Sequence, residues 1–173
     1  MRTSAGELRL RPVEPGDLPL LARWMNDPAV AAYWELDGPP ERTERHLLAQ
    51  DPERSTPYLG LLDGRPVSYW EVYRADKDPL AAHYPARPGD TGLHLLLGPA
   101  DTRGRGLGAV LIAALAEELL LGSERLVAEP DVRNTASVRA FQRAGFTASG
   151  EIELPEKRAV LLIRERARSE GAA

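Results

Sequence analysis

A glycine-rich turn with two arginines is the segment of this sequence best suited to binding an anion. Residues 103–108 read Arg-Gly-Arg-Gly-Leu-Gly. Glycines let backbone N–H groups approach an anion closely, and a helix that begins at the turn adds unpaired N–H groups and a positive dipole end. Arg103 and Arg105 add cationic donors for phosphate oxygens. The turn therefore predicts a binding site for a pyrophosphate.

Two further side chains could move protons. His94 lies inside the apolar run of residues 91–97, and a neutral imidazole can accept a proton near pH 7. Asp131 follows residues 125–129, at the end of a predicted strand where ligands gather in α/β sheets. Taken alone, a histidine in a strand is more often a hydrogen-bonded core residue, and an aspartate after a proline is often a turn residue.

Strands and helices are both needed to position these residues. Alternating or continuous apolar patterns predict strands, and the predicted strands cover residues 7–13, 56–62, 65–73, 91–97, 125–129, 146–152 and 158–164. Apolar spacing of three and four residues predicts helices, which cover residues 18–25, 40–50, 107–115 and 134–144. This order predicts an α+β fold with a mixed sheet.

Local signals mark several boundaries of these elements. Asp63 and Gly64 predict a type I′ hairpin turn, and Gly145 is placed to end a helix. Asp17 is a plausible helix N-cap. Residues 75–90 contain three prolines and no periodicity, so they predict a long loop, which is often functional in a compact domain.

Composition limits the classes of protein that the chain can be. Its 173 residues are 43% hydrophobic, which suits one domain over residues 1–173 with a disordered tail at 169–173. The formal net charge of −4 argues against nucleic-acid binding. Cysteine is absent, which excludes disulfides, thiolate metal sites and a cysteine-bound acyl intermediate. No apolar run approaches the ~18 residues of a membrane span. We expect a cytoplasmic monomer or homodimer without a metal.

Two phosphate-binding patterns match the turn. Gly104, Gly106 and Ala109 fit the dinucleotide fingerprint of nucleotide oxidoreductases, with Glu129 further along. That fold needs the glycines directly after its first strand, whereas residues 98–102 intervene here. The second pattern, R-x-x-G-x-G, is formed by Arg103, Gly106 and Gly108. A glycine-rich loop without a ligand is the remaining alternative.

The second pattern and two later motifs resemble the GNAT superfamily of acyl-CoA-dependent N-acyltransferases. Residues 134–137 read Asn-Thr-Ala-Ser, and residues 141–146 read Phe-Gln-Arg-Ala-Gly-Phe. The resemblance covers nearly the whole chain and implies a mixed, mostly antiparallel central sheet flanked by helices. It implies acyl-CoA as co-substrate, and these cofactor-binding residues: Leu96, Leu97, Arg103, Gly104, Arg105, Gly106, Leu107, Gly108, Ala109, Asn134, Ser137 and Phe141.

The resemblance also implies roles for some of these residues. The backbone of residues 103–108 would hold the pyrophosphate of coenzyme A, and the backbone of Leu96 and Leu97 would pair with the pantetheine arm. Asn134 would bind the pantetheine amide, although a helix N-cap alone would also explain it. Phe141 departs from the family pattern, because many members have a Tyr there that protonates the leaving thiolate. In this chain, either another acid protonates the leaving thiolate or the thiolate leaves unassisted.

Three further segments sharpen the resemblance toward the siderophore-biosynthesis branch: residues 67–73, 90–99 and 129–134. Members of that branch acylate the hydroxylamine nitrogen of N6-hydroxylysine or of an N-hydroxylated diamine to give a hydroxamate. The branch implies His94 and Asp131 as acid/base residues. With the charge pattern it implies these residues for the small-molecule amine: Trp34, Tyr69, Glu71 and Asp78.

Alternatives to this function remain at the level of sequence. An aminoglycoside 6′-N-acetyltransferase or another small-amine N-acetyltransferase shares several of the same segments, and a non-catalytic acyl-CoA-binding module would need only the turn. Because a hydroxylamine is much less basic than an alkylamine, it arrives unprotonated and one weak base such as His94 suffices. We expect direct transfer in a ternary complex. The choice between acetyl-CoA and succinyl-CoA, and between amino acid and diamine, is left open.

Overall fold

The computed structural model describes residues 1–167, and the predicted tail at 169–173 lies outside them. The described part of the chain forms one eight-stranded sheet in the order β1-β2-β3-β4-β5-β6-β8-β7. Only β5 and β6 pair in parallel, so the sheet is mixed and mostly antiparallel, as predicted. The strands are β1 (Arg2–Thr3), β2 (Gly6–Pro12), β3 (Ser55–Leu62), β4 (Arg65–Arg74), β5 (Thr91–Leu97), β6 (Arg125–Ala128), β7 (Thr147–Glu153) and β8 (Arg158–Glu165).

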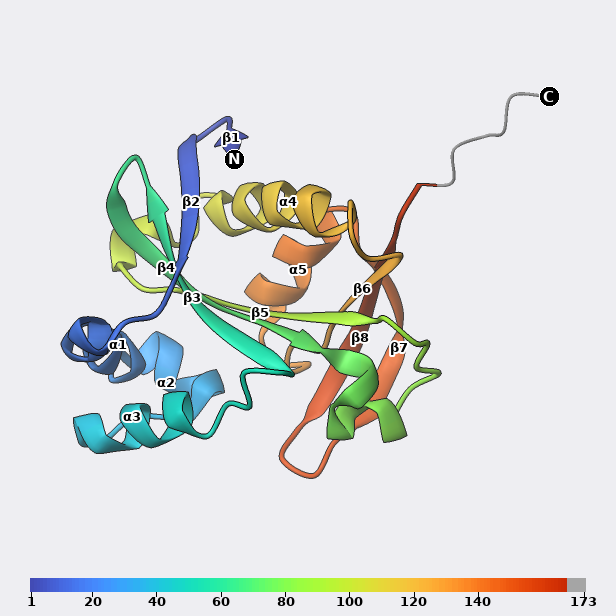
Figure 1. Ribbon diagram of the computed structural model, residues 1–173, viewed down its shortest axis with the longest axis horizontal. Helices are drawn as coiled ribbons and strands as arrows, with labels where there is room; N and C mark the ends of the chain where they lie inside the picture. Colours follow the sequence, from blue (N-terminus) through green and yellow to red (C-terminus); the bar gives the residue numbers. More distant parts are fainter. Residues whose placement is uncertain (168–173) are drawn as a thin grey trace.

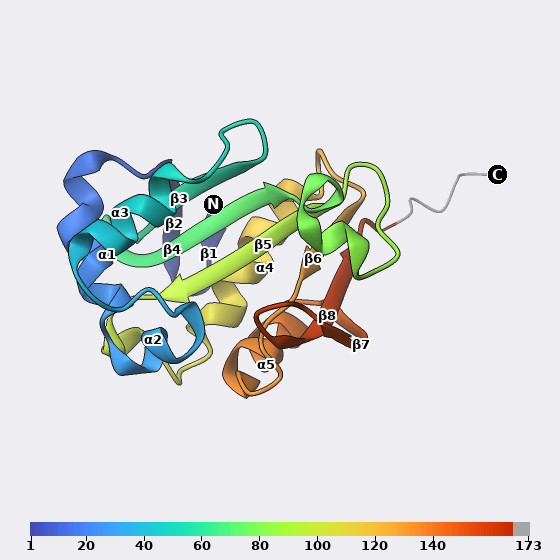
Figure 2. The same ribbon diagram turned by 90° about the horizontal axis from the view of Figure 1, so that it is seen from below.

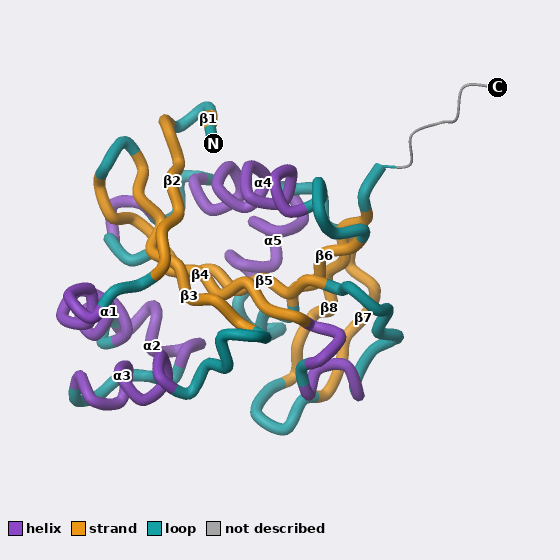
Figure 3. Tube along the Cα trace, in the orientation of Figure 1, coloured by secondary structure: helices purple, strands orange, loops and turns teal. Residues whose placement is uncertain are grey.

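Helices cover both faces of the sheet (Figures 1 and 3). The helices are α1 (Leu18–Met25), α2 (Pro28–Trp34), α3 (Pro40–Leu48), α4 (Leu107–Leu119) and α5 (Thr135–Arg143). Side chains alternate between the faces of a strand, so Trp70 packs in the core under α4 and α5 while Tyr69 packs under α1 and α2. This alternation also places Tyr69, Glu71 and Tyr73 on one face of β4.

The sheet opens between β5 and β6. These strands pair only at Thr91 with Leu126 and at Gly92 with Val127. From there to Leu97, β5 is paired with β4 alone. Figure 2 shows the free end of β5 beside α2, away from β6. One edge of β5 is therefore open in the middle of the domain.

Most of the predicted local signals are confirmed. Asp63 and Gly64 have positive φ angles of 48° and 81°, as a type I′ turn requires, and Gly145 has a φ of 87°. Asp17 is different, because its carboxylate makes no side-chain cap for α1. It accepts two hydrogen bonds from Arg11 and one from the N–H of Glu14 instead.

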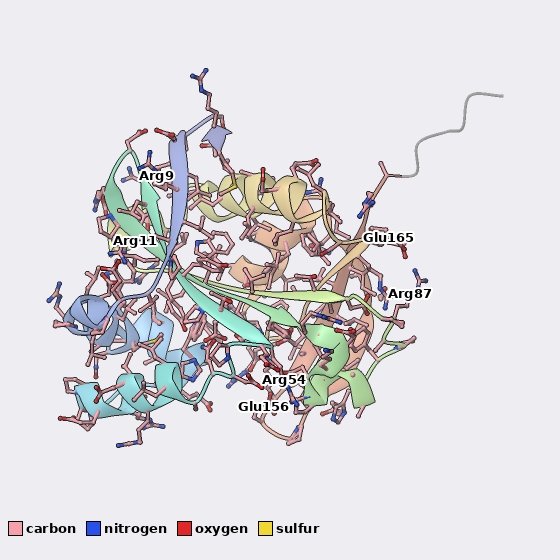
Figure 4. The ribbon with its side chains drawn as sticks, in the orientation of Figure 1. Arg9, Arg11, Arg54, Arg87, Glu156 and Glu165 are labelled. Atoms are coloured by element: carbon pink, nitrogen blue, oxygen red, sulfur yellow. The ribbon has the colours of Figure 1, made fainter. Side chains whose placement is uncertain are left out.

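The connection between β4 and β5 is more ordered than the predicted loop. It contains two short 3-10 helices, Ala75–Lys77 and Pro79–Ala82. Arg87 on this connection pairs with Glu165 at the end of β8 at 2.8 Å, and both are labelled in Figure 4. Within residues 1–167, no helix is both long enough and apolar enough to cross a membrane.

Candidate active site

A cleft of about 600 Å³ lies where the sheet opens. It is bounded by α2, the free end of β5, the glycine-rich turn and the first turns of α4 and α5. Ten of the twelve predicted cofactor-binding residues line it: Leu96, Leu97, Arg103, Gly104, Gly106, Leu107, Gly108, Ala109, Asn134 and Ser137. Arg105 and Phe141 are not among the lining residues.

The backbone of the turn fits an anion. Gly104 and Gly106 have φ angles of 72° and 80°, which side-chain-bearing residues rarely adopt, and no atom lies within 4 Å of a Cβ built on either glycine. Gly106 is the N-cap residue of α4 and has no side chain to cap the helix. The first residues of α4 line the cleft, and their N–H groups have no side-chain partner within residues 1–167.

Arg103 makes several contacts within the protein. Its guanidinium donates to the carbonyls of Leu97 and Gly98 and pairs with Asp27 at 3.0 Å through Nε and Nη2. These contacts tie the turn to the end of β5 and to the start of α2. The arginine therefore shapes the turn, and its predicted contact with a phosphate stays a prediction.

The open edge of β5 exposes the backbone of alternate residues. Gly98 donates to the carbonyl of Val67, and β4 and β5 pair without a register shift. Hydrogen-bonded pairs recur every second residue in an antiparallel ladder, so Leu96 is bonded to Tyr69 through the backbone. The groups that face the cleft belong to Leu95 and Leu97. The prediction for Leu96 is thus wrong by one residue.

Helix α5 forms the other wall of the cleft. The side chain of Asn134 accepts from the N–H of Ser137 at 3.1 Å, so the predicted N-cap is confirmed. Arg139 and Arg143, one helical turn apart, also line the cleft, and the sequence gave no signal for them. Phe141 is 2% exposed and packs edge-on against Phe146, so it belongs to the core.

His94 lies on β5 just before the cleft-lining residues 95–97, between two buried carboxylates. Its Nδ1 lies 2.9 Å from Oε2 of Glu71, and its Nε2 lies 2.5 Å from Oε1 of Glu129. Burial disfavours a charged imidazole, but the carboxylates of Glu129 and Glu71 outweigh it and raise the pKa of His94 to about 10. The prediction of a neutral imidazole does not agree with this arrangement, because both ring nitrogens donate and His94 is an imidazolium at pH 7.

Glu71 is the centre of a network on one face of β4. Besides His94, its carboxylate accepts from Nε2 of His46 at 2.6 Å, from Gln50 at 2.7 Å and from the hydroxyl of Tyr69 at 2.8 Å. Burial raises the pKa of Glu71, but its hydrogen bonds to His46 and His94 outweigh burial and hold that pKa well below its usual value. Glu71 is therefore an anion whose four hydrogen-bond partners belong to the protein itself, and its predicted role of binding a substrate ammonium stays a prediction.

Glu129 is the second buried carboxylate and follows β6. It accepts from the hydroxyl of Tyr73 at 2.7 Å and lies 3.6 Å from Nζ of Lys157. Burial raises the pKa of Glu129, but the charge of His94 outweighs it and lowers the pKa to about 2. The ring of Tyr73 also lies against His94, with centroids 4.9 Å apart. A Cβ on Gly92 would lie 2.1 Å from that ring, so only glycine leaves room for it.

The other predicted site residues divide into two groups. Trp34 lines the cleft and lies edge-on to His94 at 6.2 Å and to Tyr69 at 5.5 Å. Asp131 accepts from Arg133 through both carboxylate oxygens, and this lowers its pKa. Asp78 caps a 3-10 helix by accepting from the N–H of Leu80. The structure joins Trp34 and Tyr69 to the His94 cluster, and it gives Asp131 and Asp78 no hydrogen bond to that cluster.

Sequence reasoning missed five members of the cluster, namely His46, Gln50, Tyr73, Glu129 and Lys157. The first two come from α3 and its C-terminal end, Tyr73 from β4, Glu129 from the segment after β6 and Lys157 from the turn between β7 and β8. Alternation along β4 was the one signal available, because it places Tyr73 on the face of Glu71.

Comparisons with known proteins agree with this fold and cleft. Residues 14–154 match the family model of the acetyltransferase (GNAT) domain. The chain belongs to the GNAT acetyltransferase family. A solved structure of aminoglycoside acetyltransferase AAC(6′)-Ib with coenzyme A is 28% identical, has a TM-score of 0.79, and the match covers 92% of this chain and 95% of that one.

Two curated relatives of this GNAT chain share more of its sequence. It is 38% identical over 157 residues to a lysine N-acyltransferase, MbtK, from Mycobacterium sp. (strain MCS), covering 88% of this chain and 64% of the relative. It is 34% identical over 154 residues to an N-hydroxyputrescine acetyltransferase from Acinetobacter baumannii, and this match covers 85% of this chain and 72% of the relative. The chain thus spans just under two thirds of the length of the mycobacterial relative.

Proposed function

We propose that this GNAT protein is an acyl-CoA-dependent N-acyltransferase that acylates the hydroxylamine nitrogen of a small amine, such as N6-hydroxylysine or N-hydroxycadaverine. The observation that carries the proposal is the cleft itself, because its open strand edge ends beside a buried histidine–carboxylate cluster. The names of the relatives support the substrate class, since they act on lysine or on N-hydroxyputrescine. The enzyme would act in the cytoplasm, and its product hydroxamate would chelate iron for iron acquisition.

The residues present fit coenzyme A. The backbone of residues 104–108 and the first turn of α4 would hold the pyrophosphate, with Arg139 and Arg143 of α5 as nearby cations. Leu95, through its N–H and carbonyl, and Leu97, through its N–H, would pair with the pantetheine arm, and Asn134 also lines the cleft. The bound group supplies an activated thioester, either acetyl or succinyl.

The chain's own residues would order the reaction. A free N–H of β5 would stabilise the oxyanion as the nitrogen attacks directly, since the chain has no cysteine to carry the acyl group. His94 would belong to the catalytic site as a fixed imidazolium that holds Glu71 and Glu129 in place. Asp131 is paired with Arg133 and is an anion, so we propose that solvent protonates the leaving thiolate.

An aminoglycoside would be a polycationic acceptor and would need free carboxylates. The carboxylates of Asp76 and Asp78, on the connection between β4 and β5, are engaged by Arg74 and by backbone N–H groups. This difference favours the smaller hydroxylated amine, although AAC(6′)-Ib is similar in fold.

A thiol-release assay tests the proposal. The protein is incubated with acetyl-CoA or succinyl-CoA and with N6-hydroxylysine, N-hydroxycadaverine, lysine or kanamycin. We expect release with the hydroxylated amines, and a coloured complex of the product with ferric iron. Release with kanamycin alone would assign the protein to aminoglycosides, and no release with any amine would refute the proposal.

A further inference from the structure

The proposed transfer must dispose of one proton. An N–C bond forms between the acceptor nitrogen and the acyl carbon, the C–S bond breaks with its electron pair on sulfur, and the nitrogen loses a proton. His94 cannot take that proton, because its two ring nitrogens donate to Glu71 and Glu129. Both carboxylates are weak bases, because the donors and the charge around them, His94 above all, hold the pKa of Glu71 and the pKa of Glu129 below their usual value. A further base is needed.

His46 on α3 has the arrangement of an oriented base. Its Nε2 lies 2.6 Å from Oε1 of Glu71, and the side chain is 31% exposed. Glu71 is an anion, so Nε2 carries the hydrogen, and the lone pair is then on Nδ1. Nδ1 makes no hydrogen bond within residues 1–167. A carboxylate that fixes the tautomer of a histidine and stabilises its charged form is the arrangement of a hydrolase triad.

His46 also lies on the correct side of the sheet. The ring of Trp34 is edge-on to His46 at 6.5 Å and to His94 at 6.2 Å, and Trp34 lines the cleft. The two histidines therefore flank one tryptophan that lines the cleft. The one titratable residue of α2, Tyr33, is exposed, and its hydroxyl donates to the carbonyl of Arg133 instead.

The charged groups around His46 come from three further elements. Glu71 of β4 is in direct contact, and His94 of β5 shares that carboxylate. Arg42 lies one helical turn before His46 on α3, where its guanidinium donates to the carbonyl of Asp37. Helix α1 packs against α3, and its one charged side chain is the exposed Arg23.

We propose that His46, oriented by Glu71, accepts the proton from the attacking nitrogen; this inference rests on the proposed function. The proton goes to Nδ1, and the resulting imidazolium is stabilised by Glu71 through Nε2–H. Because the ring is partly exposed, it returns the proton to solvent, from which the thiolate is protonated. His94 then has the separate task of holding Glu71 in place from the opposite side.

The test compares His46→Gln with the wild type in the thiol-release assay. Glutamine can still donate to Glu71 but has no basic nitrogen. At saturating acetyl-CoA and hydroxylated amine, we expect kcat to fall by roughly 10²-fold, as for loss of a general base. We also expect the rising acid limb of kcat/KM against pH to disappear. His46→Ala should behave alike and regain rate on addition of imidazole. The matched control is His83→Gln, since His83 is an exposed histidine on the connection before β5.

The outcomes separate the inference from the proposed function. A wild type active on hydroxylated amines, with an unchanged kcat and pH profile in His46→Gln, would overturn only the role of His46. An effect of His46→Gln confined to the KM of the amine would also overturn the role of His46 as a base, because it would indicate a positioning residue. Failure of imidazole to restore the rate of His46→Ala would have the same meaning. A wild type that consumes no amine would overturn both.

Discussion

The cleft and the histidine–carboxylate cluster lie on two stretches of the same strand, β5, and are built in different ways. The cleft is lined by residues 95–97, by most of residues 102–109 and by residues of α2 and α5, and its strand edge and glycine-rich turn present backbone groups. The cluster consists of side chains from α3, β4, β5 and the segments after β6 and β7. Binding by backbone depends on local conformation, whereas the charge of the cluster depends on contacts between distant segments.

The largest effect is expected from removing the centre of the cluster. Glu71→Ala leaves the donors of His94, Gln50 and the buried Tyr69 without their shared acceptor. Breaking a buried ion pair by removing one partner costs about 3–5 kcal/mol. Urea unfolding at pH 7 should show this loss, with turnover abolished. Glu151→Ala, which removes an exposed carboxylate paired with Arg158, should be nearly neutral, and an equal loss there would contradict the comparison.

The charge of His94 gives the cluster a distinct dependence on pH. Its pKa is raised from 6.5 to about 10 in the folded state. The stabilisation is fully present below pH 6.5 and is lost as the pH rises through about 10. The difference in free energy of unfolding between wild type and His94→Gln should therefore shrink across this window. His83→Gln should run parallel to the wild type, and a constant difference for His94→Gln would refute the charged imidazole.

Gly92→Ala tests the packing behind His94. The new Cβ would lie 2.1 Å from the ring of Tyr73, which must move away from Glu129 and His94. Overpacking of this kind costs about 1–3 kcal/mol. We expect lower stability and lower kcat, with the Kd for coenzyme A unchanged by calorimetry. Weaker coenzyme A binding with normal kcat would mean that the two regions are not separable.

Gly106→Ala tests the cleft by itself. Gly106 has a φ of 80°, and Gly64 in the β3–β4 turn has a φ of 81°; a Cβ on either meets nothing within 4 Å. The left-handed conformation costs a residue with a side chain about 1–2 kcal/mol. Both alanine variants should lose similar stability, but only Gly106→Ala should raise the Kd for coenzyme A, by roughly tenfold. If the two variants bound coenzyme A equally well, the glycine-rich turn would not be part of the binding site.

The smallest effect on turnover is expected from Phe141→Tyr, which restores the residue found in many relatives of the superfamily. Phe141 is buried against Phe146 and does not line the cleft. A buried hydroxyl without a partner costs about 1 kcal/mol or more. Thermal unfolding should therefore occur at a lower temperature with kcat unchanged. An increased kcat would show that this position reaches the leaving thiolate.

The sequence by itself determined the fold class, the turn and most of the cleft. Each depends on neighbours along the chain: alternation gives β4 and β5 their two faces, Gly104 and Gly106 permit positive φ, and Asn134 caps α5. Such features are fixed by steric limits on a few consecutive residues, so residue type and spacing are enough to locate them.

Only the tertiary structure decided what the charged residues do. The sequence located His94 and Glu71, but not that one lies between two carboxylates or that the other binds His46. Protonation depends on which charges lie within a few ångströms and on burial, and both are set by long-range packing. The same packing ties up Arg103 and leaves a lone pair on a histidine of α3, which no local pattern encodes.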